Sequence, residues 1–145
     1  MEQTQPVRVP QAQRSALMRA RLSKAAFEVI RDQGYVNFRT AAVARRAGVS
    51  QGAQLHHYPT KNSLALAAIE YAFEETTTAS LTQVASLQAG EEPLRALVDD
   101  ARAFFFSDHF RVALDILMAG GKEESLKQDL IALTLRHRGR VERAW

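Results

Sequence analysis

The run Gly48-Val49-Ser50 separates two short amphipathic segments and restricts the local fold more than any other feature of the sequence. Apolar residues recur at helical spacing in residues 39–47, before the run, and a second helical segment, residues 51–57, follows it. Gly48 tolerates the left-handed conformation that ends many helices, and the Ser50 hydroxyl can cap the helix that starts after it. The pattern therefore predicts two short helices joined by a tight turn.

Longer helical patterns lie on both sides of this pair. Apolar residues before Gly34 follow the period of one helix face, and the glycine marks the end of that helix. Pro59 stops the second short helix, Thr60 is expected to cap a long helix after it, and Asp108 a later one. No alternating strand pattern occurs. The predicted fold class is all-α, with further helices over residues 15–33, 61–87, 92–106, 108–119 and 123–145.

Charge is distributed unevenly along the chain. Residues 1–70 contain ten Lys or Arg and four Asp or Glu, a formal charge of +6, whereas residues 71–145 carry −3. A basic part favours contact with nucleic acid, although a basic, solvated helix face explains the same charge. Two short helices with a Gly-containing turn are the components of a helix-turn-helix, which binds duplex DNA. We therefore predict a DNA-binding head in the basic part.

The second short helix carries the residues expected to meet the DNA. Small residues at its start permit close approach to the groove floor, and a glutamine amide can pair with the edge of an adenine. Basic side chains at and after its end lie where phosphates flank a major-groove helix. Without the turn, the same glutamines would be interpreted as solvated surface residues. The residues concerned are Gln51, Gly52, Ala53 and Gln54 at the start, and His56, His57 and Lys61 at the end.

The stretch from Ala47 to Lys61, AGVSQGAQLHHYPTK, resembles a subset of the TetR-type transcriptional repressors. The similarity extends from about Leu22 to Leu66 and includes the helix end at Gly34. An isolated AGVS would be weak support, whereas its combination with the upstream helix, the aromatic-proline pair and the following lysine is specific. The resemblance implies a three-helix DNA-binding head followed by an antiparallel helical bundle that binds an effector and dimerises.

Carried over by position, the resemblance assigns a role to each site residue of the head. Thr40, near the start of the first motif helix, is expected to bond a phosphate, and His57 and Lys61 are expected to touch backbone phosphates. The residues expected in or along the major groove are Ser50, Gln51, Gly52, Ala53, Gln54 and His56.

Leu55 departs from the family pattern. The family usually has Tyr at this position, and Leu cannot form the hydrogen bond that a tyrosine makes to the groove or a phosphate. We expect Leu55 to pack within the protein, with Gln54 or His56 making the contact instead. Arg45 and Arg46, on the first motif helix, are expected to face solvent rather than read bases.

The acidic part of the chain contains more apolar side chains than one helix face can hide. Phe104, Phe105 and Phe106 are about 100° apart on a helix, so we expect them to be buried on several sides. This pattern is typical of a bundle interior, and it also permits an apolar pocket for a small-molecule effector. The residues assigned to such a pocket are Phe104, Phe105, Phe110, Leu114 and Met118, the last as an adaptable wall.

The sequence offers no combination of residues for catalysis or metal binding. Cysteine is absent, and the neighbours His56 and His57 diverge on a helix, as do paired carboxylates such as Glu74-Glu75. We therefore expect no enzyme activity, no metal and no cofactor. Apolar runs fall short of the roughly 18–20 residues that span a membrane, and residues 1–14 lack a signal-peptide pattern. The expected location is the cytoplasm, with no membrane partner.

The expected organisation has three parts. Residues 1–14 form a flexible basic arm, residues 15–60 the helix-turn-helix DNA-binding domain, and residues 61–145 a helical domain for effector binding and dimerisation. We expect this last domain to be incomplete, because the final predicted helix reaches Trp145 without a stop signal while the resemblance implies further helices.

The predicted function is that of a ligand-responsive repressor that binds a palindromic, double-stranded DNA operator as a homodimer. An effector, whose identity the sequence does not give, would favour a spacing of the two heads that the operator cannot match. Two alternatives remain open. One is a helix-turn-helix activator or another DNA-binding regulator, and the other is a helical enzyme or a small-molecule or lipid carrier whose basic head is incidental.

Overall fold

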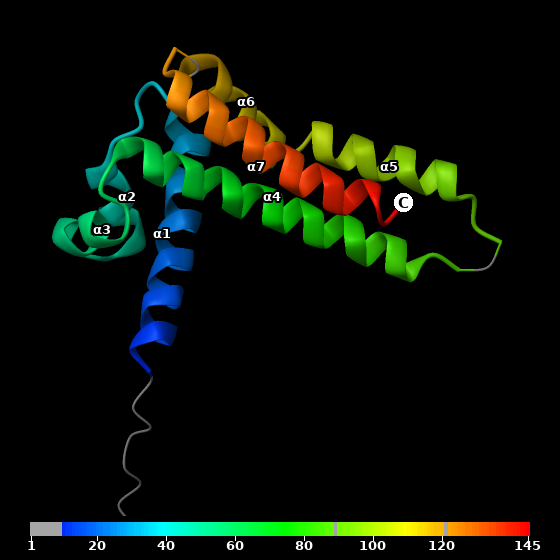
Figure 1. The fold of residues 1–145 in the computed structure, drawn as a ribbon, viewed down its shortest axis with the longest axis horizontal. Helices are drawn as coiled ribbons and strands as arrows, with labels where there is room; N and C mark the ends of the chain where they lie inside the picture. The colour runs from blue at the N-terminus through cyan, green and yellow to red at the C-terminus, as the bar shows by residue number, and fades with distance from the viewer. Residues whose placement is uncertain (1–9, 89, 121) are drawn as a thin grey trace, which may run out of the picture.

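The computed structural model describes residues 10–88, 90–120 and 122–145, and these residues form helices and no strand. The predicted all-α class is confirmed, with a helix-turn-helix head and a helical body (Figure 1). No helix in these ranges combines the length and apolar character needed to cross a bilayer. The helices are α1 (Gln11–Gln33), α2 (Thr40–Ala47), α3 (Gln51–His57), α4 (Lys61–Ser86), α5 (Pro93–Phe105), α6 (Asp108–Gly120) and α7 (Glu124–Glu142).

α1 begins at Gln11, directly after Pro10 and four residues before the predicted start at Ser15. Its first turns are polar but rich in good helix formers, and Arg14 donates to the Gln11 side chain at 2.8 Å. Residues 11–14 of the predicted arm are therefore helical, and residues 1–9 lie outside the described residues.

Side-chain caps set the starts of two body helices. The Thr60 hydroxyl accepts from the Ser63 N–H at 2.9 Å and the Ser63 hydroxyl accepts from the Thr60 N–H at 3.1 Å, a reciprocal capping box that confirms the predicted cap of α4. At α6, the Ser107 hydroxyl accepts from the Phe110 N–H at 3.1 Å. The predicted Asp108 cap is therefore wrong by one residue: Asp108 is already inside the helix.

One core of buried apolar side chains joins the head to the body. It forms where α1 packs against α4, and it continues beneath α6 and α7. Each fully buried side chain of this size contributes roughly 1.5–3 kcal/mol through its removal from water. Its largest fully buried apolar members are Leu22, Val29, Ile30, Phe38, Val43, Leu64, Ile69, Val112, Ile116 and Leu126.

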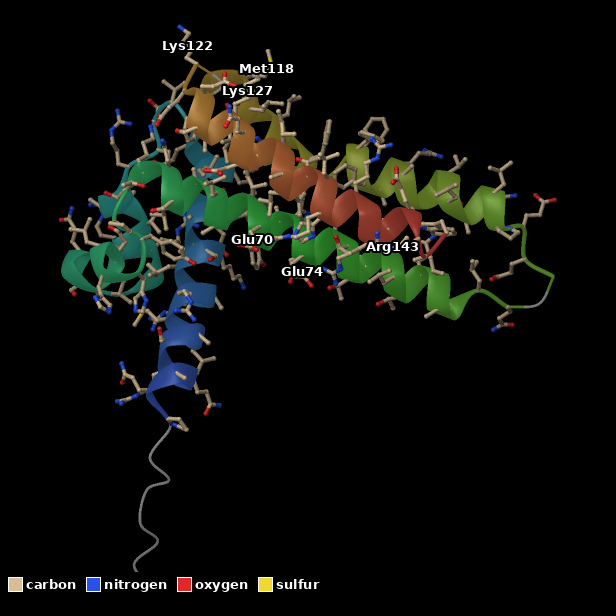
Figure 2. All side chains as sticks on the ribbon, in the orientation of Figure 1. Glu70, Glu74, Met118, Lys122, Lys127 and Arg143 are labelled. Carbon is tan, nitrogen blue, oxygen red and sulfur yellow. The ribbon has the colours of Figure 1, made fainter. Side chains whose placement is uncertain are left out.

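α7 lies alongside α4 and runs in the same direction, as Figures 1 and 2 show. Two ion pairs connect the helices along their length: Arg136 donates to Glu70 at 2.5 Å and Arg140 donates to Glu74 at 2.6 Å. Both pairs are exposed, and such pairs contribute little to stability. The packing of the buried apolar side of α7 against α4 therefore holds this part of the body together.

α5 is the least covered helix of the body, because none of its residues is buried. Phe105 is 57% exposed and Phe106 is 87% exposed, so the expected burial of three consecutive phenylalanines is wrong. The physical reason is that α5 ends at Phe105 and Phe106 belongs to the turn that follows, so its ring does not share the inner face of the helix. Only Phe104 packs against the core.

Candidate nucleic-acid interface and internal cavity

The turn between α2 and α3 has the predicted geometry. Gly48 adopts the left-handed conformation, with φ 63° and ψ 41°, and the Val49 N–H donates to the Ala44 carbonyl at 3.0 Å. The Ser50 hydroxyl accepts from the Ala53 N–H at 3.1 Å and so caps α3. A side chain at position 48 would need a strained φ, so glycine is required for this turn.

Gln54 does not lie on the surface that could meet DNA. Its side chain is 0% exposed, and its Nε2 donates to the Tyr58 carbonyl at 2.6 Å. The amide therefore closes the C-terminal end of α3 from inside the head. The prediction that Gln54 pairs with a base is wrong in this structure, because an amide buried between helices cannot reach a base edge.

Four residues form the α3 exposed face: Gln51, Gly52, Leu55 and His56. They lie three or four positions apart along one side of the helix. Leu55 is 44% exposed, so the expectation that it packs inside the protein is wrong: Gln54 takes the inner position, and the next residue is about 100° further around the helix. A Cβ at Gly52 would meet only the Ser50 hydroxyl, at 4.0 Å.

The remaining predicted residues of α3 lie at the edge of this face. Ala53 is half-buried, and so is His57. Burial lowers the pKa of His57, and the positive charges of His56 and Arg19 lower it further. Behind His57, the Tyr58 hydroxyl lies 3.1 Å from the Ser23 hydroxyl of α1. The end of α3 is therefore fixed to α1.

Thr40 and Lys61 flank the head. Thr40 is the half-buried first residue of α2. The ammonium group of Lys61 lies 4.5 Å from the centre of the Tyr35 ring and donates to the Tyr35 carbonyl at 3.4 Å. Burial lowers the pKa of Lys61, as does the positive charge of Arg39. Lys61 is thus held at the connection between α1 and α2, where part of it remains exposed.

The two arginines of α2 differ in their surroundings. Arg45 is exposed, as predicted. Arg46 donates to Glu28 at 3.3 Å and to Asp32 at 2.9 Å, so it joins α2 to α1. The Arg46 hydrogen bond lowers the pKa of Asp32, although the bond from Arg31 is the larger cause. These contacts give Arg46 a role in placing α2 against α1.

A cavity of about 740 Å³ lies in the body between α4, α5, α6 and α7. Most of its wall is apolar. Phe104, Phe105 and Phe110 form a cluster of edge-to-face rings with centroids 5.0 to 5.4 Å apart. These three residues and Leu114 line the cavity, as expected for the predicted pocket.

Met118 does not belong to the cavity. It is 76% exposed and absent from the lining, and Figure 2 shows it at the outer end of α6. Leu117, the preceding residue, lines the wall instead. The predicted pocket role of Met118 is wrong because the helix turns its side chain outward, about 100° from that of Leu117.

Two polar contacts at the cavity link helices that are distant in the sequence. The Thr77 hydroxyl of α4 lies 3.1 Å from Nδ1 of His137 on α7. The Ser80 hydroxyl of α4 donates to Asp100 of α5 at 2.6 Å and accepts from the Trp145 indole N–H at 3.0 Å. These contacts place the polar side of the cavity along α4.

α6 contacts both the cavity and the head. Phe110 and Leu114 face the cavity, whereas Asp115 accepts from the Tyr35 backbone N–H at 2.7 Å. Arg111 also donates to the carbonyl of Arg31 near the end of α1, at 3.4 Å. A displacement of α6 would therefore act directly on the connection that leads from α1 into the helix-turn-helix.

Sequence reasoning missed His137 and Asp115. For His137 a usable signal exists, because Leu126, Leu130 and His137 follow at spacings of four and seven, which puts the histidine on the buried stripe of α7. Asp115 has no such signal, since its partner lies 80 positions away.

Comparison with known proteins identifies the head and extends the similarity into the body. Residues 22–68 match the model of the bacterial regulatory proteins of the tetR family. The chain is 38% identical over 140 residues to the HTH-type transcriptional regulator CymR of Pseudomonas putida, covering 97% of this chain and 69% of that protein. An uncharacterized HTH-type transcriptional regulator of Mycobacterium tuberculosis, Rv2912c, is 28% identical over 120 residues, covering 83% of this chain and 62% of its own length.

Solved structures share the fold. The multidrug binding protein EbrR, crystallised with imidazole, superposes with a TM-score of 0.65 at 20% identity, over 87% of this chain and 70% of that one. A gamma-butyrolactone receptor described as an ArpA-like protein superposes with a TM-score of 0.53 at 22% identity, over 85% of this chain and 67% of that one. At these identities the likeness concerns the fold.

Proposed function

Because the chain belongs to the TetR family of bacterial regulatory proteins and is thus a DNA-binding transcriptional regulator, we propose that it acts as a repressor on a palindromic operator. Two copies of the chain bind the operator, and a small molecule in the body releases them. The observation that carries this proposal is one helix, α6, that lines the cavity and also binds the connection before α2.

The α3 exposed face makes the base contacts in this proposal. The Gln51 amide can pair with an adenine edge, and the Leu55 side chain can contact a thymine methyl group. Gly52, with open space around its Cα, allows the helix to approach the groove floor. Thr40, His57 and Lys61 contact phosphates, which position the helix without reading sequence.

A two-fold pair of heads explains a palindromic operator. In helix-turn-helix dimers the two recognition helices enter successive major grooves about 34–36 Å apart, so operator symmetry mirrors protein symmetry. The proposed dimer must therefore hold its two α3 helices at this spacing for the operator to bind.

Release follows from the two contacts of α6. A molecule that fills the cavity presses on Phe110 and Leu114, and α6 transmits its displacement through Asp115 to Tyr35. The ligand shifts the balance between operator-binding and released arrangements only as far as its affinity differs between them. The proposed ligand therefore binds the released arrangement more tightly.

The test is a selection of duplexes bound by the full chain from a random pool, followed by a screen for small molecules that release the enriched DNA. The proposal predicts a palindromic consensus and at least one releasing compound. Sites that overlap promoters support repression, whereas sites upstream of them support an activator. Recovery of no preferred sequence contradicts the proposed function.

A further inference from the structure

We propose that the cavity takes an apolar molecule with one acceptor oxygen, of the carbonyl or carboxylate kind, and that the Nε2–H of His137 donates to that oxygen. This inference rests on the proposed effector binding and specifies the chemical class of the effector. Its basis is the polar accounting of the cavity wall, which leaves one donor unused.

The cavity selects for an apolar body. Aromatic rings from α5 and α6 and aliphatic side chains from α6 and α7 make most of its wall. Its volume of about 740 Å³ falls within the roughly 300–1,000 Å³ range of small-molecule sites. In such sites a few placed polar groups fix the orientation of the ligand.

Most polar side chains of the lining are already bonded within the protein. The bonds are Thr76 to the Ala72 carbonyl at 3.1 Å, Thr134 to the Leu130 carbonyl at 2.8 Å, Ser80 to Asp100 at 2.6 Å, and Arg138 to Glu142 at 2.5 Å. The remaining pair is Thr77 with His137. Among the described residues, Nε2 of His137 has no hydrogen-bond partner.

The His137 ring is held in a fixed position beside the cavity. The residue is 6% exposed, and its ring packs against Phe73 of α4 with centroids 5.6 Å apart. Its Nδ1 is engaged by Thr77, so rotation of the ring would break that bond. A buried polar nitrogen held this way without a partner is costly, and a ligand atom that pairs with it recovers the cost.

Hydrogen-bond accounting decides which nitrogen carries the proton. The Thr77 hydroxyl has the His137 ring as its only hydrogen-bond partner among the described residues. If Thr77 donates to Nδ1, its own proton and the Nδ1 lone pair are both satisfied, and only Nε2–H is left over. The reverse tautomer leaves two groups unsatisfied, the hydroxyl proton and the Nε2 lone pair. The first arrangement is therefore favoured, and it needs an acceptor.

The ring presents this donor in its neutral form. Burial lowers the pKa of His137; Glu74 and Glu70 oppose the shift, and Arg136 and Arg140 add to it. A neutral donor serves a ketone or lactone oxygen as well as a carboxylate, so the ligand class is defined by the acceptor atom. The experiment separates the neutral and anionic members.

The probes are three molecules of similar size: butylbenzene, which has no oxygen, valerophenone, which has a ketone, and 4-butylbenzoate, which has a carboxylate. Their binding to the full chain is measured by displacement of the fluorophore 1-aminoanthracene. In the wild-type chain we expect valerophenone, 4-butylbenzoate or both to bind roughly tenfold more tightly than butylbenzene, the gain of one buried hydrogen bond.

The variants test whether His137 produces this preference. In His137→Phe we expect the oxygen-bearing probes to lose their advantage while butylbenzene binds as before, since an aromatic ring still fills the site. His137→Leu is measured beside it, so the test does not depend on the folding of one variant. His109→Phe is the matched control, because His109 stacks on Phe27 at 5.0 Å and lies outside the cavity lining.

Equal affinities for all three probes in the wild-type chain overturn the inference, as does a preference that survives in both His137 variants. Displacement by none of the probes overturns it as well. Selected operator DNA is titrated with the same samples. Sequence-specific DNA binding combined with equal probe affinities leaves the proposed regulator intact, whereas absence of sequence-specific binding by the wild-type chain is a failure of the proposed function itself.

Discussion

The carboxylate of Asp115 accepts a hydrogen bond of 2.7 Å from the backbone N–H of Tyr35, and so fastens α6 to the start of the connection between α1 and α2. The preceding residue, Leu114, lines the cavity. Lys61 lies over the ring of the same Tyr35, 4.5 Å from its centre. One tyrosine therefore contacts the helix that senses the cavity and a predicted phosphate-binding residue.

Asp115→Ala is expected to lower the free energy of unfolding by about 1–3 kcal/mol, because a hydrogen bond to a charged acceptor is lost in a partly buried place. It should also reduce the effect of a releasing ligand on operator affinity. Urea unfolding and operator titration with and without that ligand measure the two effects. Asp108→Ala, which removes an exposed pair with Arg111, is the control and should change neither. An unchanged ligand effect in Asp115→Ala argues against this route.

Two glutamines of α3 should respond in opposite ways to substitution. Gln54→Ala removes a buried amide and its bond to the Tyr58 carbonyl, so we expect a loss of about 1–3 kcal/mol of stability. Gln51→Ala should leave unfolding nearly unchanged, because its side chain is exposed, but should weaken and broaden DNA recognition. Thermal melts and selection from a random pool separate these effects. A stable Gln54→Ala with altered base preference would show that the assigned faces are reversed.

Lys61→Ala should weaken operator binding uniformly across sequences. A lysine that contacts a phosphate releases a counterion on binding, so its loss should reduce the slope of log affinity against log salt by about one. Lys122→Ala removes the same charge from the exposed α6–α7 connection, far from α3 in Figure 2, and should leave the slope unchanged. Equal slopes for both variants and the wild type would remove Lys61 from the interface.

Stability should fall as the pH drops below about 6.5. Burial holds the pKa of His137 below its ordinary value in the folded chain, so the unfolded chain binds the proton first and gains from acidification. The loss begins near the unfolded pKa and is complete below the folded one. His57 acts in the same direction, so His137→Phe should remove only part of the dependence. Urea unfolding between pH 5 and 8 measures it; an identical pH dependence in this variant contradicts the assignment.

Local signals predicted the head well. The left-handed Gly48, the Ser50 cap and the Thr60 cap act within a few residues of themselves, so α3 has its predicted bounds. The rotation of α3 about its own axis was not predictable in the same way. It depends on packing against α1, and it places Gln54 inside and Leu55 outside.

The cavity could be predicted only in part. The phenylalanines of α5 and α6 indicated an apolar site, and Phe104 and Phe110 line it. Its polar side comes from pairs that lie far apart in the sequence, such as Thr77 and His137, 60 positions apart. Their meeting is fixed by the packing of α7 against α4, a property of the whole body rather than of either segment.

Operator binding by Gly52→Leu tests the central claim most directly. Only the Ser50 hydroxyl lies within 4 Å of a Cβ at this position, so the fold tolerates the side chain, and leucine should raise helix stability by roughly 0.5–1 kcal/mol. If the α3 exposed face enters the major groove, the same side chain blocks close approach. We predict an unfolding midpoint equal to or above that of the wild type, with operator affinity lower by roughly tenfold or more. Wild-type operator affinity in a folded Gly52→Leu chain would contradict the account.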